Sequence, residues 1–255
     1  MPIDIQYGKT DVPVGHPIPV FPVAPDSSTI SQATSLISEA ARRVIVAGGG
    51  VISGDSSGEL QELAEKLNAP VFMSGNGRGA IPDDHELSMG TVLNRPRTRE
   101  ALEDTEVIIA VGTRLRGRLN TWQNLPGKLI HIDVDPQNHN LVHNAVVNVI
   151  ADAKQSLRAL LAAMNAEPGD SDYLSGVRAA YEEQKQQTHE RIGVDMEAIM
   201  GCLRDSMDRD MVFVRDMTMP AYAWGNDWFP ILAPHTTMNP NSGAIGPGLP
   251  LGNGA

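Results

Sequence analysis

Residues 107–112 read VIIAVG, an unbroken run of apolar side chains that stops at a glycine. A strand with one face in water alternates polar and apolar residues, whereas a strand covered on both faces is apolar throughout. The run therefore predicts a strand in a parallel sheet that lies between two layers of helices.

Segments of the same character lie on both sides of this run, and residues at helical spacing separate them. We expect strands at 44–47, 71–73, 129–132 and 146–150, and helices at 30–41, 60–67, 101–102 and 157–164. Strands that alternate with helices at this spacing predict a doubly wound, Rossmann-like α/β domain.

The remainder of the chain divides around that domain. Residues 1–28 include a strap of five prolines, and 29–165 form the α/β domain. Residues 166–192 are expected to be a polar linker with a charged surface helix. Residues 193–255 are expected to hold a helix at 195–207 and a strand at 212–214, followed by a tail rich in Pro, Gly and Trp. This last part is interpreted as an incomplete second α/β domain.

Composition excludes several classes of protein. The 255 residues carry a formal net charge of −11, so the surface lacks the basic character that binds nucleic acid or an anionic membrane. No run approaches the roughly 18 apolar residues of a membrane span, and the first residues do not resemble a signal peptide. A cytoplasmic location is expected. Cys202 is the only cysteine, and its apolar surroundings predict that it is buried.

A ligand site is expected beyond the carboxyl ends of the strands, where open parallel sheets bind their ligands. Small, basic and acidic residues follow all five strands there: 48–50, 74–79, 112–114, 133–135 and Asp152. Glycines allow close approach to a ligand and expose backbone N–H groups to phosphate oxygens. Arg78 and Arg114 could donate to a diphosphate, and Asp133 or Asp135 could accept from ribose hydroxyls. The set predicts a nucleotide site.

Other chemistries are disfavoured. Ser53 stands where the dinucleotide fingerprint has its third glycine, and no acidic residue ends the second strand, so an ordinary nicotinamide dehydrogenase is not expected. His139 and His143 are four residues apart, but no third ligand is evident and no metal site is predicted.

Four motifs resemble the central domain of acetolactate synthase-like, thiamine-diphosphate-dependent enzymes in order and spacing. They are 43–50 (RVIVAGGG), 77–85 (GRGAIPDDH), 108–114 (IIAVGTR) and 131–136 (HIDVDP). Residues 2–6 resemble the end of the family's pyrimidine-binding domain, and 243–250 resemble part of its diphosphate-binding domain.

The resemblance implies ligands for these positions. Central domains of the family bind FAD in some members, ADP in others and neither in others. The residues at the matching positions are Gly48, Gly49, Gly50, Ser74, Gly75, Asn76, Gly112, Thr113, Arg114, Asp133 and Asp135. Gly243, Ala244 and Ile245 match positions that contact thiamine diphosphate, and Ile245 matches the bulky residue that bends this cofactor.

The resemblance also sets limits. The family's catalytic Glu lies in the pyrimidine domain and its magnesium motif lies after the segment matched by 243–250, so no catalytic residue and no metal ligand is expected in these 255 residues. Pro247 and Asn253 stand where the family usually has apolar residues. Thiamine diphosphate and Mg²⁺ are expected only in a complete enzyme.

The sequence is thus interpreted as a fragment, inactive alone, of a carboligase or decarboxylase of 2-keto acids. Its expected partners are copies of itself, as a dimer or tetramer, or the enzyme's other domains. Apolar surface at Phe213, Trp224, Trp228 and Phe229 is expected to be exposed and to drive association. The alternatives are a stand-alone nucleotide-binding module and a structural domain with an empty cleft.

Overall fold

The computed structural model describes residues 8–9, 11, 15–16, 21–116, 124–240 and 243–255. Its centre is a five-stranded sheet whose strands are all parallel and lie in the order β2-β1-β3-β4-β5. The strands are β1 (Arg43–Ala47), β2 (Val71–Met73), β3 (Val107–Val111), β4 (Lys128–Asp133) and β5 (Val147–Ile150). All five strands expected from apolar runs are present.

One face of the sheet is covered by α2 (Ser27–Glu39), α4 (Ser57–Leu67) and α6 (Ala153–Ala163). Their buried residues pack against Ile45 and Ile109, which point to this face because side chains alternate along a strand. The carboxylates of Asp26 and Asp152 accept hydrogen bonds from the first backbone N–H groups of α2 and α6, so both helices begin at a capping aspartate. Asp152, one of the expected nucleotide-compatible residues, is therefore a helix cap.

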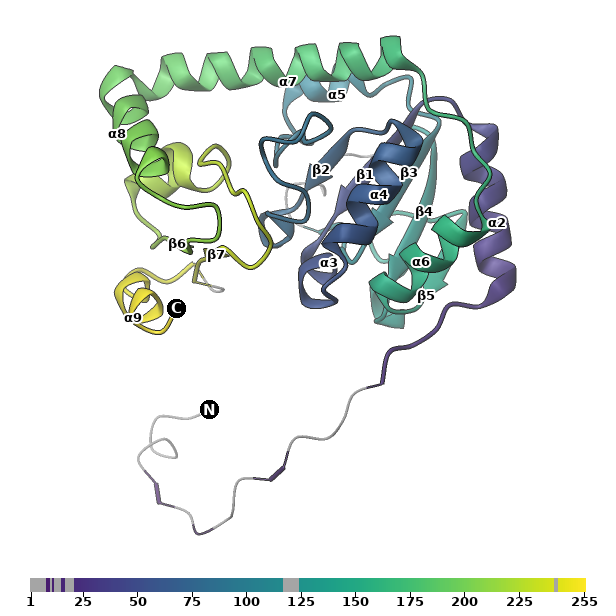
Figure 1. The fold of residues 1–255 in the computed structure, drawn as a ribbon, viewed down its shortest axis with the longest axis horizontal. Coiled ribbons are helices and arrows are strands. Elements are labelled where there is room, and N and C mark those ends of the chain that lie inside the picture. Colours follow the sequence, from purple (N-terminus) through teal and green to yellow (C-terminus); the bar gives the residue numbers. More distant parts are fainter. Residues whose placement is uncertain (1–7, 10, 12–14, 17–20, 117–123, 241–242) are drawn as a thin grey trace.

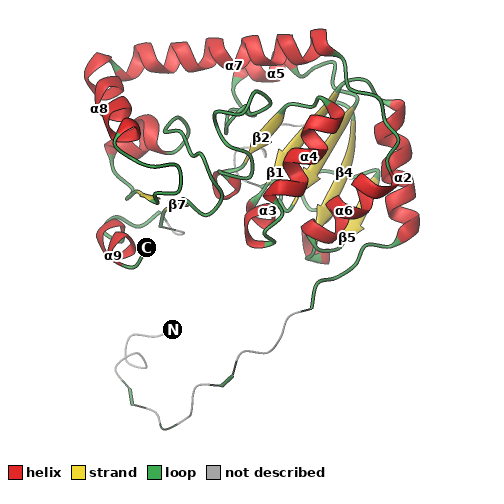
Figure 2. Cartoon of the chain, viewed as in Figure 1, coloured by secondary structure: helices red, strands yellow, loops and turns green. Residues whose placement is uncertain are grey.

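The other face carries α5 (Pro96–Ala101) and α7 (Ser171–Ile192), which pack against each other. Val44, Val46 and Ile108 point to this face and share a core with Val177 and Tyr181 of α7. Helices thus lie on both faces of a parallel sheet, which confirms the predicted doubly wound α/β fold (Figure 2).

Helix α7 continues beyond the sheet and leads to a smaller C-terminal unit, beside β2 (Figure 1). This unit holds α8 (Val194–Asp205), the parallel pair β6 (Phe213–Val214) and β7 (Thr237–Met238), a π-helical turn η4 (Ala221–Gly225) and α9 (Gly248–Asn253). The strand at β6 and the helix at α8 were expected. The turn η4, β7 and α9 were not expected, because they lie in the tail rich in Pro, Gly and Trp, where no apolar run or helical spacing marks them.

The four aromatic residues of the C-terminal unit that were expected to be exposed are buried, so that expectation is wrong. Phe213, Trp224, Trp228 and Phe229 are at most 8% exposed. The rings of Phe213 and Phe229 stack with centroids 3.9 Å apart, and Trp228 stacks on Tyr181 of α7 at 6.3 Å. The unit covers its aromatic side chains with each other and with α7, which compensates for its small sheet.

Cys202 is exposed, contrary to the expectation of burial. Met200 is the residue that α8 buries, and Met196 and Leu203 pack beside it, which leaves Cys202 on the opposite side of the helix. Apolar neighbours in the sequence thus indicated the wrong face. Among the described residues, none of the helices is both long and apolar enough to cross a bilayer.

Candidate functional site

A cleft of about 710 Å³ opens at the carboxyl ends of β1 and β3. These strands are neighbours, while β2 lies on the outer side of β1 and β4 on the outer side of β3. The chain reverses its direction across the sheet between β1 and β3, and loops that leave this point in opposite directions form a crevice. The cleft therefore lies where an open α/β sheet places its ligand.

The loops after β1 and β3 touch each other through glycines. The N–H of Gly48 donates to the carbonyl of Val111 at 2.9 Å, and that of Gly50 to the carbonyl of Gly112 at 2.9 Å. A Cβ on Gly48 would lie 2.1 Å from the Gly112 carbonyl oxygen, and one on Gly112, which has φ +58°, would lie 2.6 Å from the Gly50 Cα. These glycines first of all allow two loops to pack together.

Other residues of the loops face the cleft. Gly49 begins the short helix α3 (Gly49–Ser53), and Gly75 begins the single turn η1 (Gly75–Gly77). A Cβ on Gly75 would meet no atom within 4 Å, so this position borders open space. The hydroxyl of Ser74 accepts from the Gly77 N–H at 3.2 Å and caps that turn.

Two aspartates lie at the β4 end of the cleft. The Oδ1 atom of Asp133 accepts from the N–H of Asp135 at 2.9 Å and from Nδ2 of Asn138 at 3.1 Å. Asp135 caps the turn η3 (Pro136–Asn138). These bonds hold both carboxylates at the rim, and Asp133 is 8% exposed.

The buried side chain of His131 is hydrogen-bonded to the loop after β3. Nε2 of His131 lies 2.7 Å from the carbonyl oxygen of Thr113, to which it donates. Burial lowers the pKa of His131 below its ordinary value, so the imidazole is held neutral in the fold. The ring lies 4.5 Å from that of His139. His139 follows η3 and is not on a helix, so it does not pair with His143 on one helix face.

The structure brings together most of the residues expected for the nucleotide. Of the eleven expected positions, all but Gly48 line the cleft: Gly49, Gly50, Ser74, Gly75, Asn76, Gly112, Thr113, Arg114, Asp133 and Asp135. Gly48 lies in the contact between the loops.

The residues that the resemblance assigned to thiamine diphosphate are not part of this cleft. Gly243, Ala244 and Ile245 are exposed, Ile245 by 79%. The carboxylate of Asp216, just after β6, accepts from the N–H groups of Gly246 at 2.8 Å and Gly248 at 3.0 Å and thus ties their segment to β6.

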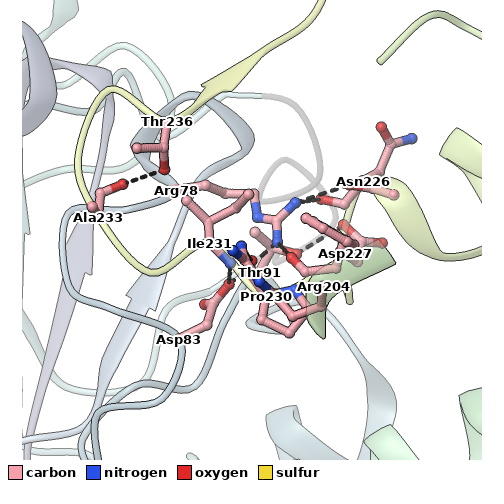
Figure 3. A network of polar contacts seen from close by, with 12 residues as sticks. Arg78, Asp83, Thr91, Arg204, Asn226, Asp227, Pro230, Ile231, Ala233 and Thr236 are labelled. Carbon is pink, nitrogen blue, oxygen red and sulfur yellow. Dashed lines mark hydrogen bonds and ion pairs between the residues drawn. The ribbon is translucent and has the colours of Figure 1, made fainter. Parts of the chain in front are cut away.

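Arg78 does not face the cleft, which corrects its expected role as a diphosphate donor. It is 1% exposed, and its guanidinium donates to backbone carbonyls of the C-terminal unit: Gly225 at 2.9 Å, Asn226 at 3.1 Å, and Phe229 (Figure 3). It also forms an ion pair with Asp83 at 3.2 Å. The guanidinium joins the two units of the chain.

The C-terminal unit supplies cleft residues that sequence reasoning missed, among them Arg215, Asn226 and Asp227. Asp227 accepts from Thr91 at 2.8 Å (Figure 3) and from Arg95 at 3.2 Å. Arg215 directly follows β6, but the ligand site was expected only at the ends of the central strands, and Asn226 and Asp227 follow no strand. All three lie far along the chain from the loops after β1 to β4. Only the packing of the two units reveals them.

Arg215 is the most buried cation of the cleft wall, at 9% exposed. Its Nε donates to the Gly225 carbonyl at 3.3 Å, but Nη1 is buried and has no hydrogen-bond partner in the described part of the chain. Burial, reinforced by the charge of Arg78, lowers the pKa of Arg215 to about 10. Within the described ranges, no three His, Cys, Asp or Glu side chains are grouped to hold a metal ion.

Comparison with known proteins gives the family. Residues 30–160 match the family described as the central domain of thiamine pyrophosphate enzymes. A probable 2-ketoarginine decarboxylase of Pseudomonas aeruginosa is 31% identical over 234 residues, which are 91% of this chain and 41% of that protein. A probable acetolactate synthase large subunit of Methanocaldococcus jannaschii is 36% identical over 64% of this chain and 30% of its own length.

Glyoxylate carboligase of Escherichia coli O157:H7 is 33% identical over 63% of this chain and 28% of that enzyme. The chain thus spans less than half of the length of these relatives. The matched span contains the whole five-stranded sheet and every loop that the sheet contributes to the cleft. The chain belongs to the family of thiamine-pyrophosphate-dependent enzymes, of which residues 30–160 form the central domain.

Proposed function

We propose that the cleft binds an adenine nucleotide of the FAD or ADP type. The observation that carries the proposal is the convergence of the loops after β1, β2, β3 and β4 on one cleft, with Asp133 and Asp135 at one end of it. Glycine-rich loops suit a phosphate chain, because no side chain keeps it from the backbone. Carboxylates suit the hydroxyls of a ribose.

The two aspartates have different parts in this proposal. Asp133 uses Oδ1 to hold its own loop, which leaves Oδ2 to accept from a ribose hydroxyl. Asp135 is exposed and uses its carboxylate to cap η3, so it supports the rim. Arg114 is an exposed cleft residue, and in this proposal its guanidinium donates to the phosphates.

We further propose that this chain supplies the central domain and part of the diphosphate-binding side of a carboligase or decarboxylase of 2-keto acids. The proposal rests on relatives named as a 2-ketoarginine decarboxylase, an acetolactate synthase and a glyoxylate carboligase. Its domain limits are 29–165 for the central domain, 166–192 for the connecting helix and 193–255 for the second domain. The alternative is a nucleotide-binding module without catalysis.

Thiamine diphosphate, with Mg²⁺, is the cofactor of this proposed enzyme, and the cofactor would supply the carbanion chemistry. The described residues fit it on one side only: Gly243, Ala244 and Ile245 lie in a segment tied to Asp216, and Ile245 is largely exposed. We therefore place these three residues at the edge of a site that other segments of an enzyme complete.

A dimer or tetramer is part of the same proposal. The C-terminal unit exposes four large apolar side chains, namely Met219 at 75%, Tyr222 at 61%, Ile245 at 79% and Leu249 at 76%. Surfaces of this kind mark protein interfaces. Light scattering behind a size-exclusion column tests this point, and a monodisperse monomer would contradict it.

The nucleotide proposal is tested on the purified chain. A flavin absorption band, or adenine nucleotide released on denaturation, is the expected result for a ligand retained from the cell. Isothermal titration with FAD and with ADP tests the protein after stripping. An absence of binding for both nucleotides overturns the proposal.

A pair of variants locates the site. Asp133→Asn removes a charge at the rim and is expected to weaken nucleotide binding by about tenfold, the loss of one charge-assisted hydrogen bond. Asp205→Asn removes the same charge from the exposed end of α8, outside the cleft, and is expected to bind as the wild type does. Equal losses in the two variants would show a general charge effect and contradict the assignment.

A further inference from the structure

The wall of the cleft opposite the aspartates contains a buried positive charge that the carboxylates among the described residues do not fully compensate. Arg78 and Arg215 both donate to the carbonyl of Gly225, at 2.9 and 3.3 Å, so the two guanidinium groups are neighbours. Arg78 has Asp83 as its counterion. Like charges this close raise each other's electrostatic energy, and an additional anion would relieve it.

The carboxylate that attracts Arg215 is hydrogen-bonded to other side chains. Asp227 attracts Arg215 electrostatically, but its Oδ1 accepts from Thr91 and its Oδ2 from Arg95. The group thus contains three arginines, Arg78, Arg95 and Arg215, against the two carboxylates of Asp83 and Asp227. Among these described residues the arginines outnumber the carboxylates by one, and Arg215 is the arginine of the three that lines the cleft.

Arg215 also has unused donors. The terminal nitrogens of Arg78 donate hydrogen bonds to three backbone carbonyls and to the Asp83 carboxylate. Arg215 uses Nε on one carbonyl, while the buried Nη1 has no partner among the described residues. A buried donor without a partner costs about 1–3 kcal/mol. Because Arg215 lines the cleft, a bound ligand could supply the acceptor that its Nη1 lacks.

The position of Arg215 relates it to the proposed nucleotide. Asp133 follows β4, whereas Arg215 belongs to the C-terminal unit, which lies beside β2 (Figure 1). The strand order places β1 and β3 between β2 and β4. A ligand that reaches from Asp133 to Arg215 therefore crosses the glycine loops at Gly49–Gly50 and Gly112.

We propose that Arg215 is the anion subsite of the cleft and binds the terminal phosphate of a nucleoside diphosphate whose ribose lies at Asp133. This inference rests on the proposed nucleotide binding and deepens it. It selects a ligand whose far end is anionic, such as ADP, over a dinucleotide whose far end is an uncharged ring. The C-terminal unit then binds the phosphate end of the ligand, and the central domain binds the ribose.

The test is isothermal titration of the wild type and of Arg215→Gln with ADP, adenosine, FAD and inorganic pyrophosphate. We expect the wild type to bind ADP at least about tenfold more tightly than adenosine. In Arg215→Gln this preference should fall to about twofold or less, with the affinity for adenosine retained. Pyrophosphate should compete with ADP on the wild type and lose affinity for the variant.

Arg209→Gln is the matched control, because it removes a cation of the same unit whose partner is the exposed Asp84, outside the cleft. It should keep the wild-type preference for ADP. If Arg215→Gln does not fold, an NMR titration replaces it. The Arg215 Nε–H resonance is assigned as the side-chain signal that is absent from the spectrum of Arg215→Lys. In the wild type this signal should shift when ADP is added and should not shift when adenosine is added.

Several outcomes would overturn this inference and leave nucleotide binding intact. Arg215→Gln could keep the wild-type preference for ADP, or could bind pyrophosphate as tightly as the wild type does. The wild type could bind FAD more tightly than ADP with no effect of the substitution, or the NMR signal could show no shift specific to ADP. A different outcome concerns the proposed function. If ADP, FAD and adenosine all fail to bind to the wild type, nucleotide binding itself is wrong and the subsite falls with it.

Discussion

Arg78 and Asp83 form an ion pair of 3.2 Å that is almost closed to solvent, with side-chain exposures of 1% and 12%. Arg78 follows η1 in the central domain, and it donates to carbonyls of the C-terminal unit. Asp83 in turn accepts from the N–H of Ile231 at 2.8 Å (Figure 3). Both members of the pair thus bind backbone of the other unit, and together they fasten the two units.

Replacing Arg78 by methionine should destabilise the chain strongly. The substitution removes the cation that is paired with the Asp83 carboxylate and the side-chain donor of the Asn226 and Phe229 carbonyls. Breaking a buried pair costs about 3–5 kcal/mol. The urea midpoint measured by circular dichroism should fall accordingly. Arg209→Gln breaks an exposed pair with Asp84 and should leave the midpoint unchanged. A small effect of Arg78→Met would contradict the role given to the pair.

Substitution of a glycine by alanine should lower the free energy of unfolding where the glycine lies in the contact between two loops, and should leave it nearly unchanged where the glycine borders the cleft. Gly112→Ala places a Cβ 2.6 Å from Gly50 at φ +58°, so overpacking of about 1–3 kcal/mol adds to the cost of the left-handed backbone. Gly75→Ala meets no atom within 4 Å, so it should leave stability nearly unchanged and affect only ligand binding.

Gly176→Ala calibrates these two measurements. This glycine lies exposed within α7 and has open space around it. The substitution should stabilise the protein by about 0.5–1 kcal/mol, as alanine does in a helix. Urea unfolding of the three variants checks the order Gly176→Ala, Gly75→Ala, Gly112→Ala from most to least stable, and a stable Gly112→Ala would refute the tight contact between the loops.

His131 should make stability depend on pH. Its folded pKa lies below the ordinary value of 6.5, because burial disfavours the imidazolium. As the pH falls below 6.5, His131 binds a proton in the unfolded chain but stays neutral in the folded chain. The free energy of unfolding therefore decreases on acidification, by up to about 1.4 kcal/mol per pH unit. The loss ends below the folded pKa.

The measurement compares His131→Phe with the wild type by urea unfolding between pH 7 and pH 5. The variant should show a shallower decline, since it lacks the titrating ring. His235→Gln, at an exposed position, should follow the wild-type curve. Parallel curves for His131→Phe and the wild type would refute the neutral, buried histidine.

Cys202 should react with a thiol reagent in the native protein. It is exposed on α8, so one equivalent of Ellman's reagent should be consumed without denaturant and at a rate close to that in urea. Cys202→Ser should show no reaction, because the sequence has no other cysteine. Reaction that starts only on unfolding would show the thiol to be covered.

The sequence by itself determined the central sheet and the loops that end its strands. Apolar runs such as 107–111 need cover on both faces, and this local requirement leaves a parallel sheet as the outcome. Since the carboxyl ends of parallel strands share one edge, residues as distant as Gly49 and Asp133 were expected together, and they line one cleft. The motifs of the family lie in the same loops.

Tertiary structure alone decided which side chains close the cleft and which hold it together. Arg78 and Arg215 are the same residue type, yet one fastens the two units and the other faces the cleft, because burial and counterions depend on the partner segment. The same reason explains Cys202, whose local pattern indicated burial, and Phe213, which was expected to be exposed because its domain was expected to be incomplete. Periodicity describes a segment's own faces, while contact between segments more than a hundred residues apart is set only when they pack.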